Sequence, residues 1–247
     1  MEILNSILNK KSSGKKQIAI LIDPDKKDVN AIITLCRDAE AAQVDHIFVG
    51  GSLLTQGVSE NCVEVVKRSC NIPVILFPGN SIQIDPNADA ILFLSLISGR
   101  NPDLLIGQHV IGAPIIKKYG LEVIPTGYML IESGRTTTAL YMSNTHPIPR
   151  EKDDIAACTA LAGEMLGLKV IFMDAGSGAK HTVSNSMIKL VSSTISIPLI
   201  VGGGIKKPED AIEVVKSGAD LIVIGNSIEE DPSLLSKMTD AVHSVMA

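Results

Sequence analysis

The sequence is poor in aromatic residues, with no Trp, three Tyr and four Phe among its 247 residues. Proteins that bind single-stranded nucleic acid stack the bases on aromatic side chains, and this chain has few such rings to offer. Its formal net charge of -5 also disfavours a polyanionic partner. We therefore expect no nucleic acid among its partners.

Long apolar runs and paired cysteines are missing as well. No apolar run approaches the roughly 18 residues of a membrane-spanning helix, so no transmembrane segment is expected. The first lysines follow the amino-terminal apolar residues instead of preceding them, which is the wrong order for a signal peptide. The cysteines show no metal-binding spacing; they are Cys36, Cys62, Cys70 and Cys158. These features predict a cytoplasmic protein with reduced cysteines.

The chain is rich in glycine at the ends of short apolar runs. Residues 199–201 end in three glycines that include Gly203 and Gly204, and residues 221–224 end in Gly225 and Asn226. Pro208 suits the first turn of a helix between the two runs. This order predicts two consecutive parallel strands whose glycine loops lie at the same edge of the sheet.

Glycine loops of this kind can bind phosphate through their backbone amides, because no Cβ keeps the phosphate oxygens away. A third turn, Asp174-Ala175-Gly176-Ser177-Gly178, follows the apolar run 169–173. In an eightfold barrel the three turns would be neighbours, which predicts a site for one small phosphorylated molecule. The alternative is that the glycines only shape tight turns.

Apolar runs and helical segments alternate along the whole chain. This alternation predicts an α/β fold, a single (β/α)8 TIM barrel that spans residues 1–247 as one domain. The expected strands are 17–22, 46–49, 73–77, 90–94, 122–125, 169–173, 199–201 and 221–224, with 126–132 as an irregular or paired extension of the fifth. The expected helices are 28–43 with Asp28 as its cap, 59–69, 103–119, 153–166, one after Ser184, 208–216 and 232–245, and residues 1–8 form an amphipathic turn or two. An internal repeat supports a barrel of repeated strand-and-turn units. Residues 45–53 align with residues 220–228, and residues 88–95 are similar to both. Chance similarity among apolar strands is the alternative.

Two connections depart from the regular pattern. Residues 78–87 are too short and too rich in helix breakers for a full outer helix. A missing third outer helix would leave an apolar flank open to a long apolar substrate or a partner chain, whereas the alternative is merely a short loop. Residues 133–150 form a long polar excursion, and we expect a lid or a substrate contact there.

Charged and polar side chains suggest where a metal binds. Asp23 and Ser52 follow the first two strands, and hard oxygen ligands of this kind suit magnesium that also binds phosphate. The alternative for Asp23 is a turn cap. Lys26, Arg135 and Arg150 are candidates for binding a diphosphate. The alternative for each is a side chain that is only solvated at the surface. None of the five histidines is paired with a carboxylate in the sequence pattern. No lysine lies in the middle of an expected strand, where it could form a Schiff base, and this counts against an aldolase.

Several motifs together resemble those of geranylgeranylglyceryl phosphate synthases and the related bacterial heptaprenylglyceryl phosphate synthases. They cover residues 21–26, 49–52, 122–128, 147–150, 175–178, 202–205 and 224–226. The resemblance implies a barrel without its third outer helix. It also implies magnesium-dependent transfer of a long prenyl group, geranylgeranyl, from its diphosphate to the 3-hydroxyl of sn-glycerol 1-phosphate. A homo-oligomer, either a dimer or a hexamer, is expected.

The resemblance also assigns the site residues. Asp174 is the expected catalytic residue, and magnesium is expected on Asp23 and Ser52. The expected glycerol 1-phosphate site consists of Phe172, Met173, Asp174, Ala175, Gly176, Ser177, Gly178, Gly203, Gly204, Gly225 and Asn226. The family usually has Tyr-Leu-Glu where this chain has Phe-Met-Asp at 172–174, so a hydroxyl is missing and the carboxylate is one methylene shorter. This departure bears on affinity or rate, and not on the fold.

The expected mechanism is an allylic displacement. Magnesium neutralises the leaving diphosphate, and the glycerol hydroxyl attacks while its proton passes to Asp174. The glycine turns position the acceptor. Three alternatives stay open: another phosphate-handling barrel enzyme such as an isomerase or lyase, a non-catalytic phosphate- or lipid-binding barrel, and an apolar flank that serves only assembly.

Overall fold

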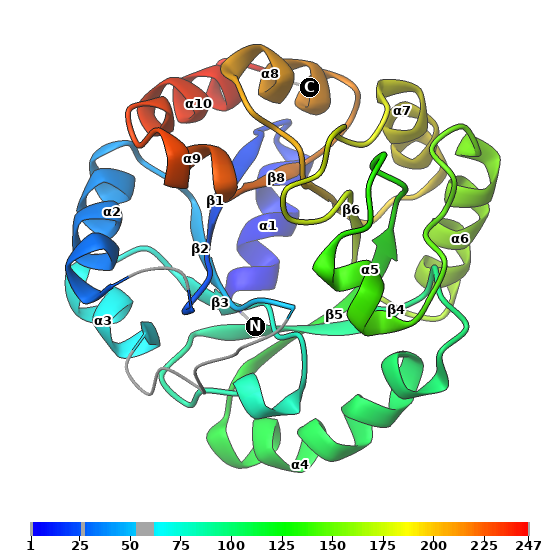
Figure 1. Cartoon of the computed structure of the whole chain (residues 1–247), viewed down its shortest axis with the longest axis horizontal. Helices are drawn as coiled ribbons and strands as arrows, with labels where there is room; N and C mark the ends of the chain where they lie inside the picture. The colour runs from blue at the N-terminus through cyan, green and yellow to red at the C-terminus, as the bar shows by residue number, and fades with distance from the viewer. Residues whose placement is uncertain (1, 26–27, 53–61, 247) are drawn as a thin grey trace.

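The computed structural model describes residues 2–25, 28–52 and 62–246. Eight parallel strands pair in chain order and close into a barrel, with helices around the outside (Figure 1). The strands are β1 (Gln17–Ile22), β2 (His46–Val49), β3 (Val74–Leu76), β4 (Ala90–Leu96), β5 (Glu122–Leu130), β6 (Val170–Asp174), β7 (Leu199–Gly202) and β8 (Leu221–Ile224). The expected TIM barrel is confirmed.

Most expected helices are present near their expected bounds. They are α1 (Glu2–Ser12), α2 (Val29–Ala41), α3 (Cys62–Ser69), α4 (Gln108–Tyr119), α5 (Thr138–Ser143), α6 (Asp153–Met165), α7 (Asn185–Thr194), α8 (Pro208–Lys216), α9 (Asn226–Glu230) and α10 (Leu234–His243). Asp28 caps α2 as expected, accepting a hydrogen bond from the amide of Ala31 at 2.8 Å. The start expected for α3, near residue 59, lies outside the described residues.

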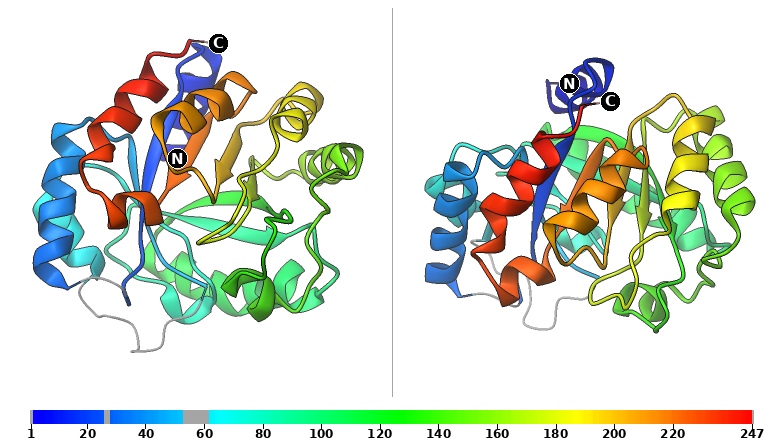
Figure 2. Two further views of the ribbon diagram at one scale, coloured as in Figure 1. Left: turned by 45° about the horizontal axis from the view of Figure 1, so that its top comes forward. Right: turned by 90° about the horizontal axis from the view of Figure 1, so that it is seen from above.

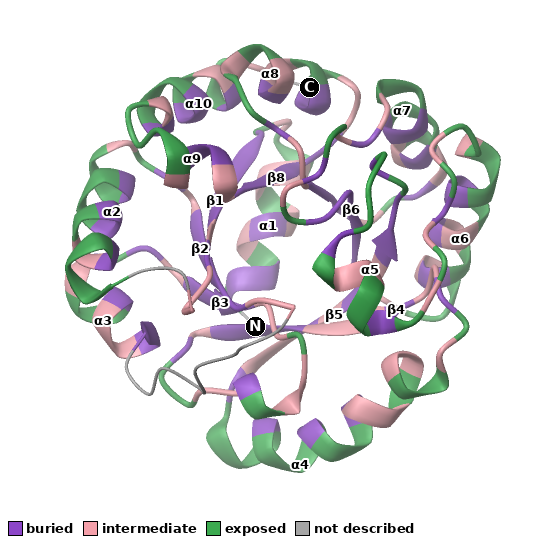
Figure 3. Cartoon of the chain, in the orientation of Figure 1, coloured by how far each residue is buried: buried purple, intermediate pink, exposed green. Residues whose placement is uncertain are grey.

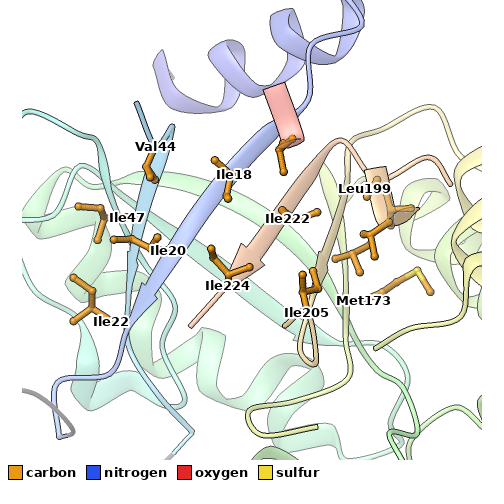
Figure 4. Packing of buried hydrophobic residues seen from close by; sticks show 14 of the residues in the cluster. Ile18, Ile20, Ile22, Val44, Ile47, Met173, Leu199, Ile205, Ile222 and Ile224 are labelled. Atoms are coloured by element: carbon orange, nitrogen blue, oxygen red, sulfur yellow. The ribbon is translucent and has the colours of Figure 1, made fainter. Parts of the chain in front are cut away.

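The core has two layers. Alternate strand residues point outward and pack under the helices, whose inner faces are buried (Figure 3). Figure 4 shows part of this outer layer, in which Ile18 and Ile20 of β1 lie beside Ile222 and Ile224 of β8. The remaining strand residues, such as Ala19, fill the barrel interior. Burial on both faces explains why the strands appear in the sequence as continuous apolar runs.

The amino-terminal segment is a longer helix than the turn or two expected from the sequence. Helix α1 lies at the end of the barrel opposite the loops that carry α5 and α9 (Figure 2). Its buried residues Ile3, Leu4 and Ile7 pack against the interior layer. The Glu122 carboxylate accepts hydrogen bonds from the amides of residues 2–4 at 2.7, 3.0 and 2.9 Å. It thereby provides acceptors for the first amides of the helix, which have none within the helix itself. The carboxyl ends of the strands therefore form the open end of the barrel.

The aspartates of the internal repeat share one structural role. Asp45, Asp89 and Asp220 each accept a hydrogen bond from a backbone amide at the start of the preceding strand, at 2.8, 2.8 and 2.9 Å. The repeat thus marks equivalent positions in different strand units. Asp45 also lies 3.0 Å from Nε2 of His243. The expectation that no histidine pairs with a carboxylate is therefore wrong, although this pair lies beside α1, at the closed end.

The connection from β3 to β4 lacks an outer helix, as expected. All of residues 77–89 are described, and they contain only the 3₁₀ turn η1 (Ser81–Gln83). After β4, the segment η2 (Asp103–Gly107) is a π-helix that leads into α4, where the sequence predicted one regular helix from Asp103. Short π segments of this kind occur frequently at functional sites.

The excursion after β5 is fastened to the barrel. β5 extends to Leu130, in agreement with the extension expected over 126–132, and Ile131 then forms a parallel bridge with Ile148. The backbone amide of His181 donates to the carbonyl of Ser133 at 3.2 Å. These contacts hold the excursion beside the turn that follows β6. Within the described ranges, the helices are all too short or too polar to cross a membrane.

Candidate active site

Two cavities meet at the open end of the barrel. One is a polar cavity of about 860 Å³, lined by the turns after β1, β6, β7 and β8. The other is a mostly apolar groove of about 300 Å³ between β4, η1 and α4. Both are lined by Gly51, Ser52, Phe77 and Tyr128. A ligand with a charged head and an apolar tail could therefore occupy the two cavities together.

The polar cavity brings together most of the predicted site residues. It is lined by Asp23, Ser52, Phe172, Asp174, Gly176, Ser177, Gly178, Gly203, Gly204, Gly225 and Asn226. The side chains of Met173 and Ala175 point away from it and pack in the outer layer of the core. Arg135 lines the cavity, whereas Arg150 donates a hydrogen bond to the carbonyl of Thr182. Lys26, the third candidate cation, lies outside the described residues.

The glycine turns after β6 and β7 are also required by the fold. Gly176, Gly178, Gly203 and Gly204 have φ values of 88°, 69°, 83° and 74°, which favour glycine. A Cβ on Gly203 would lie 2.6 Å from the backbone nitrogen of Gly176, so the two turns pack directly on each other. Gly225 is different, because the nearest atoms to its Cβ position are 3.6 Å away and its φ is -141°. The fold therefore does not demand glycine at 225.

Asp174 ends β6 and is 7% exposed. Its Oδ1 accepts a hydrogen bond from the amide of Gly176 at 2.7 Å, and its Oδ2 accepts one from the hydroxyl of Tyr128 at 2.5 Å. Burial raises the pKa of Asp174, although both hydrogen bonds act in the opposite direction. Asp174 thus caps the turn that follows it, and its carboxylate accepts a proton more readily than an exposed aspartate does.

Tyr128 is the site residue to which the sequence assigned no role. It pairs in register with Phe172 on the neighbouring strand, and Phe77 completes an aromatic cluster. The ring centroids are 5.2 Å apart for Phe77 and Phe172, 5.5 Å for Tyr128 and Phe172, and 5.7 Å for Phe77 and Tyr128. These rings form a wall where the two cavities meet. Phe172 has no hydroxyl, and the hydroxyl that donates to Asp174 is that of Tyr128.

Asp23 and Ser52, the residues predicted to hold magnesium, both line the polar cavity. The Oδ1 atom of Asp23 is 3.2 Å from the position of a Cβ on Gly51, the residue before Ser52. No group of three or more His, Cys, Asp or Glu side chains that could hold a metal occurs in the described part of the chain. One carboxylate and one hydroxyl nevertheless suit magnesium, which completes its shell with substrate phosphates and water.

A glycine inside a helix forms part of the groove wall. A Cβ on Gly112, in the middle of α4, would lie 3.3 Å from Cδ1 of Ile84 and 3.7 Å from Cδ1 of Ile116. Glycine in a helix interior costs about 1 kcal/mol relative to alanine. Here it lets α4 pack closely on Ile84 in the wall of the groove, so a larger side chain at 112 would push into the groove.

Comparisons with known proteins agree with this geometry. The model of the PcrB family matches residues 11–246. The chain is 56% identical over 243 residues to the geranylgeranylglyceryl phosphate synthase of Chitinophaga pinensis, covering 98% of this chain and 96% of that relative. It is similar to the wild-type GGGPS structure from Thermoplasma volcanium, with 35% identity, a TM-score of 0.93 and full coverage of both chains, 100% each.

A second solved structure is informative about the ligand of a relative. It is the (S)-3-O-geranylgeranylglyceryl phosphate synthase of Thermoplasma acidophilum in complex with its substrate sn-glycerol-1-phosphate. The similarity covers 99% of this chain and 100% of that one, with 31% identity and a TM-score of 0.93. The fold described above is therefore shared, over its whole length, with a protein that binds a small phosphorylated molecule.

Proposed function

This chain belongs to the PcrB family, and we propose that it transfers a geranylgeranyl group from its diphosphate to the 3-hydroxyl of sn-glycerol 1-phosphate. The resemblance drawn from the sequence motifs is thereby confirmed. The reaction forms an ether-lipid precursor and releases diphosphate. One observation supports it above all others: the polar cavity and the apolar groove meet at Tyr128, whose hydroxyl is bonded to Asp174.

The two cavities suit the two substrates. The phosphate of glycerol 1-phosphate binds to the backbone amides of the turns at Gly203, Gly204, Gly225 and Asn226. The prenyl tail lies in the groove, so that its first carbon reaches the junction of the two cavities. Asp174 then accepts the proton of the 3-hydroxyl as the oxygen attacks this carbon. The glycine turns contribute by holding the acceptor in position.

The aromatic wall and the metal ligands act on the donor substrate. Positive charge develops on the allylic carbon as the bond to diphosphate breaks, and the rings of Phe77 and Tyr128 favour a cation beside their faces. The same rings exclude water from the junction. Asp23 and Ser52 would hold magnesium, which neutralises charge on the leaving diphosphate when it is bound.

A transfer assay tests the function. The protein is incubated with magnesium, labelled glycerol 1-phosphate and prenyl diphosphates of 10, 15, 20 and 35 carbons. We expect an ether product whose formation depends on glycerol 1-phosphate and is fastest with the 20-carbon donor. Binding of glycerol 1-phosphate without any product would instead identify a non-catalytic phosphate-binding barrel.

Gly225→Val tests the phosphate site without straining the fold. Because a Cβ at 225 meets no atom closer than 3.6 Å, the variant should fold normally. Its side chain would nevertheless stand where the phosphate approaches the backbone. We expect calorimetry to show at least tenfold weaker binding of glycerol 1-phosphate, with an unchanged melting temperature. Equal affinity in the variant and the parent would place the phosphate elsewhere.

Gly112→Leu tests the groove. The added side chain would extend toward Ile84 and Ile116 and shorten the space for the prenyl tail. We expect the preferred donor to change from 20 to 15 carbons, measured as kcat/KM for each prenyl diphosphate, while KM for glycerol 1-phosphate stays within twofold. Ala113→Leu is the matched control, because Ala113 is exposed on the same helix. Preserved 20-carbon preference in Gly112→Leu would show that the tail does not pass this residue.

We further propose that the protein works as a homo-oligomer, a dimer or a hexamer, built from one barrel domain spanning residues 1–247. The support is an exposed apolar face on α4, where Val110, Ile111 and Ile115 are 67%, 55% and 36% exposed. Light scattering on the purified protein tests this assembly. We also propose a cytoplasmic location, supported by four free cysteines.

A further inference from the structure

Arg135 is placed against the turn that follows β6. It belongs to the excursion between β5 and α6 and lines the polar cavity. A Cβ on Gly178 would lie 2.9 Å from Nη2 of Arg135, so the guanidinium lies directly over the backbone of this glycine turn. Ser177 and Asn226, whose side chains are hydrogen-bonded to each other at 2.9 Å, line the same cavity.

The position of Arg135 is fixed by its neighbours. The carbonyl of Ser133 accepts a hydrogen bond from the amide of His181 at 3.2 Å, and the Ser133 hydroxyl donates to the carbonyl of Arg135 at 3.3 Å. Thr137 packs on Gly176, because a Cβ there would lie 2.7 Å from its Oγ1 atom. The backbone on both sides of Arg135 is therefore attached to the loop that follows β6.

The guanidinium has no partner within the described ranges. No described carboxylate or carbonyl accepts a hydrogen bond from it, and it forms no ion pair with a described residue. A guanidinium carries five N–H donors. Five donors at the wall of a cavity, without acceptors among the described residues, are suited to an anionic ligand.

The charges around the cavity favour such a cation. Its described lining includes six carboxylates, from Asp23, Asp25, Asp174, Glu229, Glu230 and Asp231. Only two described cations line it, Arg135 and Lys206. A phosphate dianion among so many carboxylates requires a nearby positive charge, because backbone amides supply only partial charges. Arginine can bind two phosphate oxygens at once, which lysine cannot do.

We propose that Arg135 binds the phosphate group of glycerol 1-phosphate, closing over the glycine turns from the side of the excursion. The inference rests on the proposed function and adds to it a phosphate-binding residue in the excursion, where the sequence predicts a lid or a substrate contact. Arg135 contacts the acceptor substrate, and not the prenyl diphosphate held on the side of Asp23.

Binding and kinetics of Arg135→Gln test this assignment. Calorimetry with glycerol 1-phosphate alone should show about tenfold weaker binding than in the parent, as expected for the loss of charged hydrogen bonds. Steady-state kinetics should show a matching rise in KM for glycerol 1-phosphate, with KM for the prenyl diphosphate within twofold. Arg135→Lys, which keeps the charge and loses the paired geometry, should give an intermediate value.

Lys207→Gln is the matched control. It removes the same charge from an exposed residue next to Lys206, and it does not line the cavity. The inference is overturned if Arg135→Gln binds glycerol 1-phosphate as tightly as Lys207→Gln, or if only KM for the prenyl diphosphate rises. A parent protein that binds glycerol 1-phosphate but forms no ether would refute the proposed function, while the calorimetric result for Arg135 would still stand.

Discussion

Asp174→Asn is expected to lower kcat by about a thousandfold, within the range for loss of a general base. An amide cannot accept the proton of the glycerol hydroxyl at neutral pH, so the attacking oxygen loses its base. Steady-state kinetics at saturating concentrations of both substrates measure the effect. KM for glycerol 1-phosphate should change less than kcat, because the phosphate is held mainly by other groups.

The asparagine variant keeps the structural role of this residue. Its side-chain oxygen can still accept the hydrogen bond that Oδ1 of Asp174 accepts from Gly176, and asparagine caps turns well. An unchanged melting temperature would exclude loss of the turn as the cause of inactivity. Asp174→Glu, which retains a carboxylate, should retain turnover. If Asp174→Asn turned over like the parent, Asp174 would be a cap and the mechanism would be wrong at its central step.

The pH dependence of the parent should report the same group. Burial raises the pKa of Asp174 above the range of an exposed aspartate. A base must be ionised to act, so kcat should be fully developed above this pKa and should be lost as the pH falls through it. The acidic limb of the profile should therefore lie at a higher pH than the titration of an ordinary aspartate.

Asp23→Asn is expected to lower kcat/KM for the prenyl diphosphate by about a hundredfold, or about 2.7 kcal/mol. The substitution removes the only carboxylate in the predicted magnesium site. A second readout is independent of turnover. In calorimetry the parent should bind prenyl diphosphate more tightly with magnesium than without it, and Asp23→Asn should lose this difference while binding glycerol 1-phosphate normally.

Asp231→Asn is the matched control for that experiment. Asp231 lines the same cavity on the side of β8, and its Oδ1 accepts a hydrogen bond from the amide of Ser233 at 3.0 Å, which asparagine can also accept. We expect this variant to keep the magnesium dependence of the parent. Equal loss in both variants would indicate a general effect of charge, and full activity of Asp23→Asn at limiting magnesium would remove Asp23 from the site.

Local signals were sufficient to predict most of the fold. Continuous apolar runs gave the strands because every strand is buried on both faces, and Asp28 marked the start of α2. Helix α1 was underestimated because its stability depends on distant contacts. In the sequence, Lys10 and Lys11 only follow the amino-terminal apolar residues, whereas in the structure they pair with Asp45 and Asp220 at 2.5 and 2.8 Å. No local pattern reveals such partners.

The sequence predicts those site residues that directly follow a strand. It does not predict those whose position depends on how neighbouring strands or loops align. The glycine turns and Asp174 follow strands directly, and the carboxyl ends of parallel strands lie at one edge. Tyr128 reaches Asp174 only because β5 continues well past residue 125 and pairs with β6 so that Tyr128 is opposite Phe172. The role of Arg135 likewise depends on how the excursion packs against Gly178.

The identity of the attacking oxygen is the central claim, and isotope labelling tests it most directly. Glycerol 1-phosphate carrying ¹⁸O in its 3-hydroxyl is incubated with the protein, magnesium and geranylgeranyl diphosphate, and the products are analysed by mass spectrometry. The mechanism predicts that the ether retains the ¹⁸O and that the released diphosphate contains none, because the glycerol oxygen attacks carbon. Loss of ¹⁸O from the ether, or an ether formed without glycerol 1-phosphate, would contradict it.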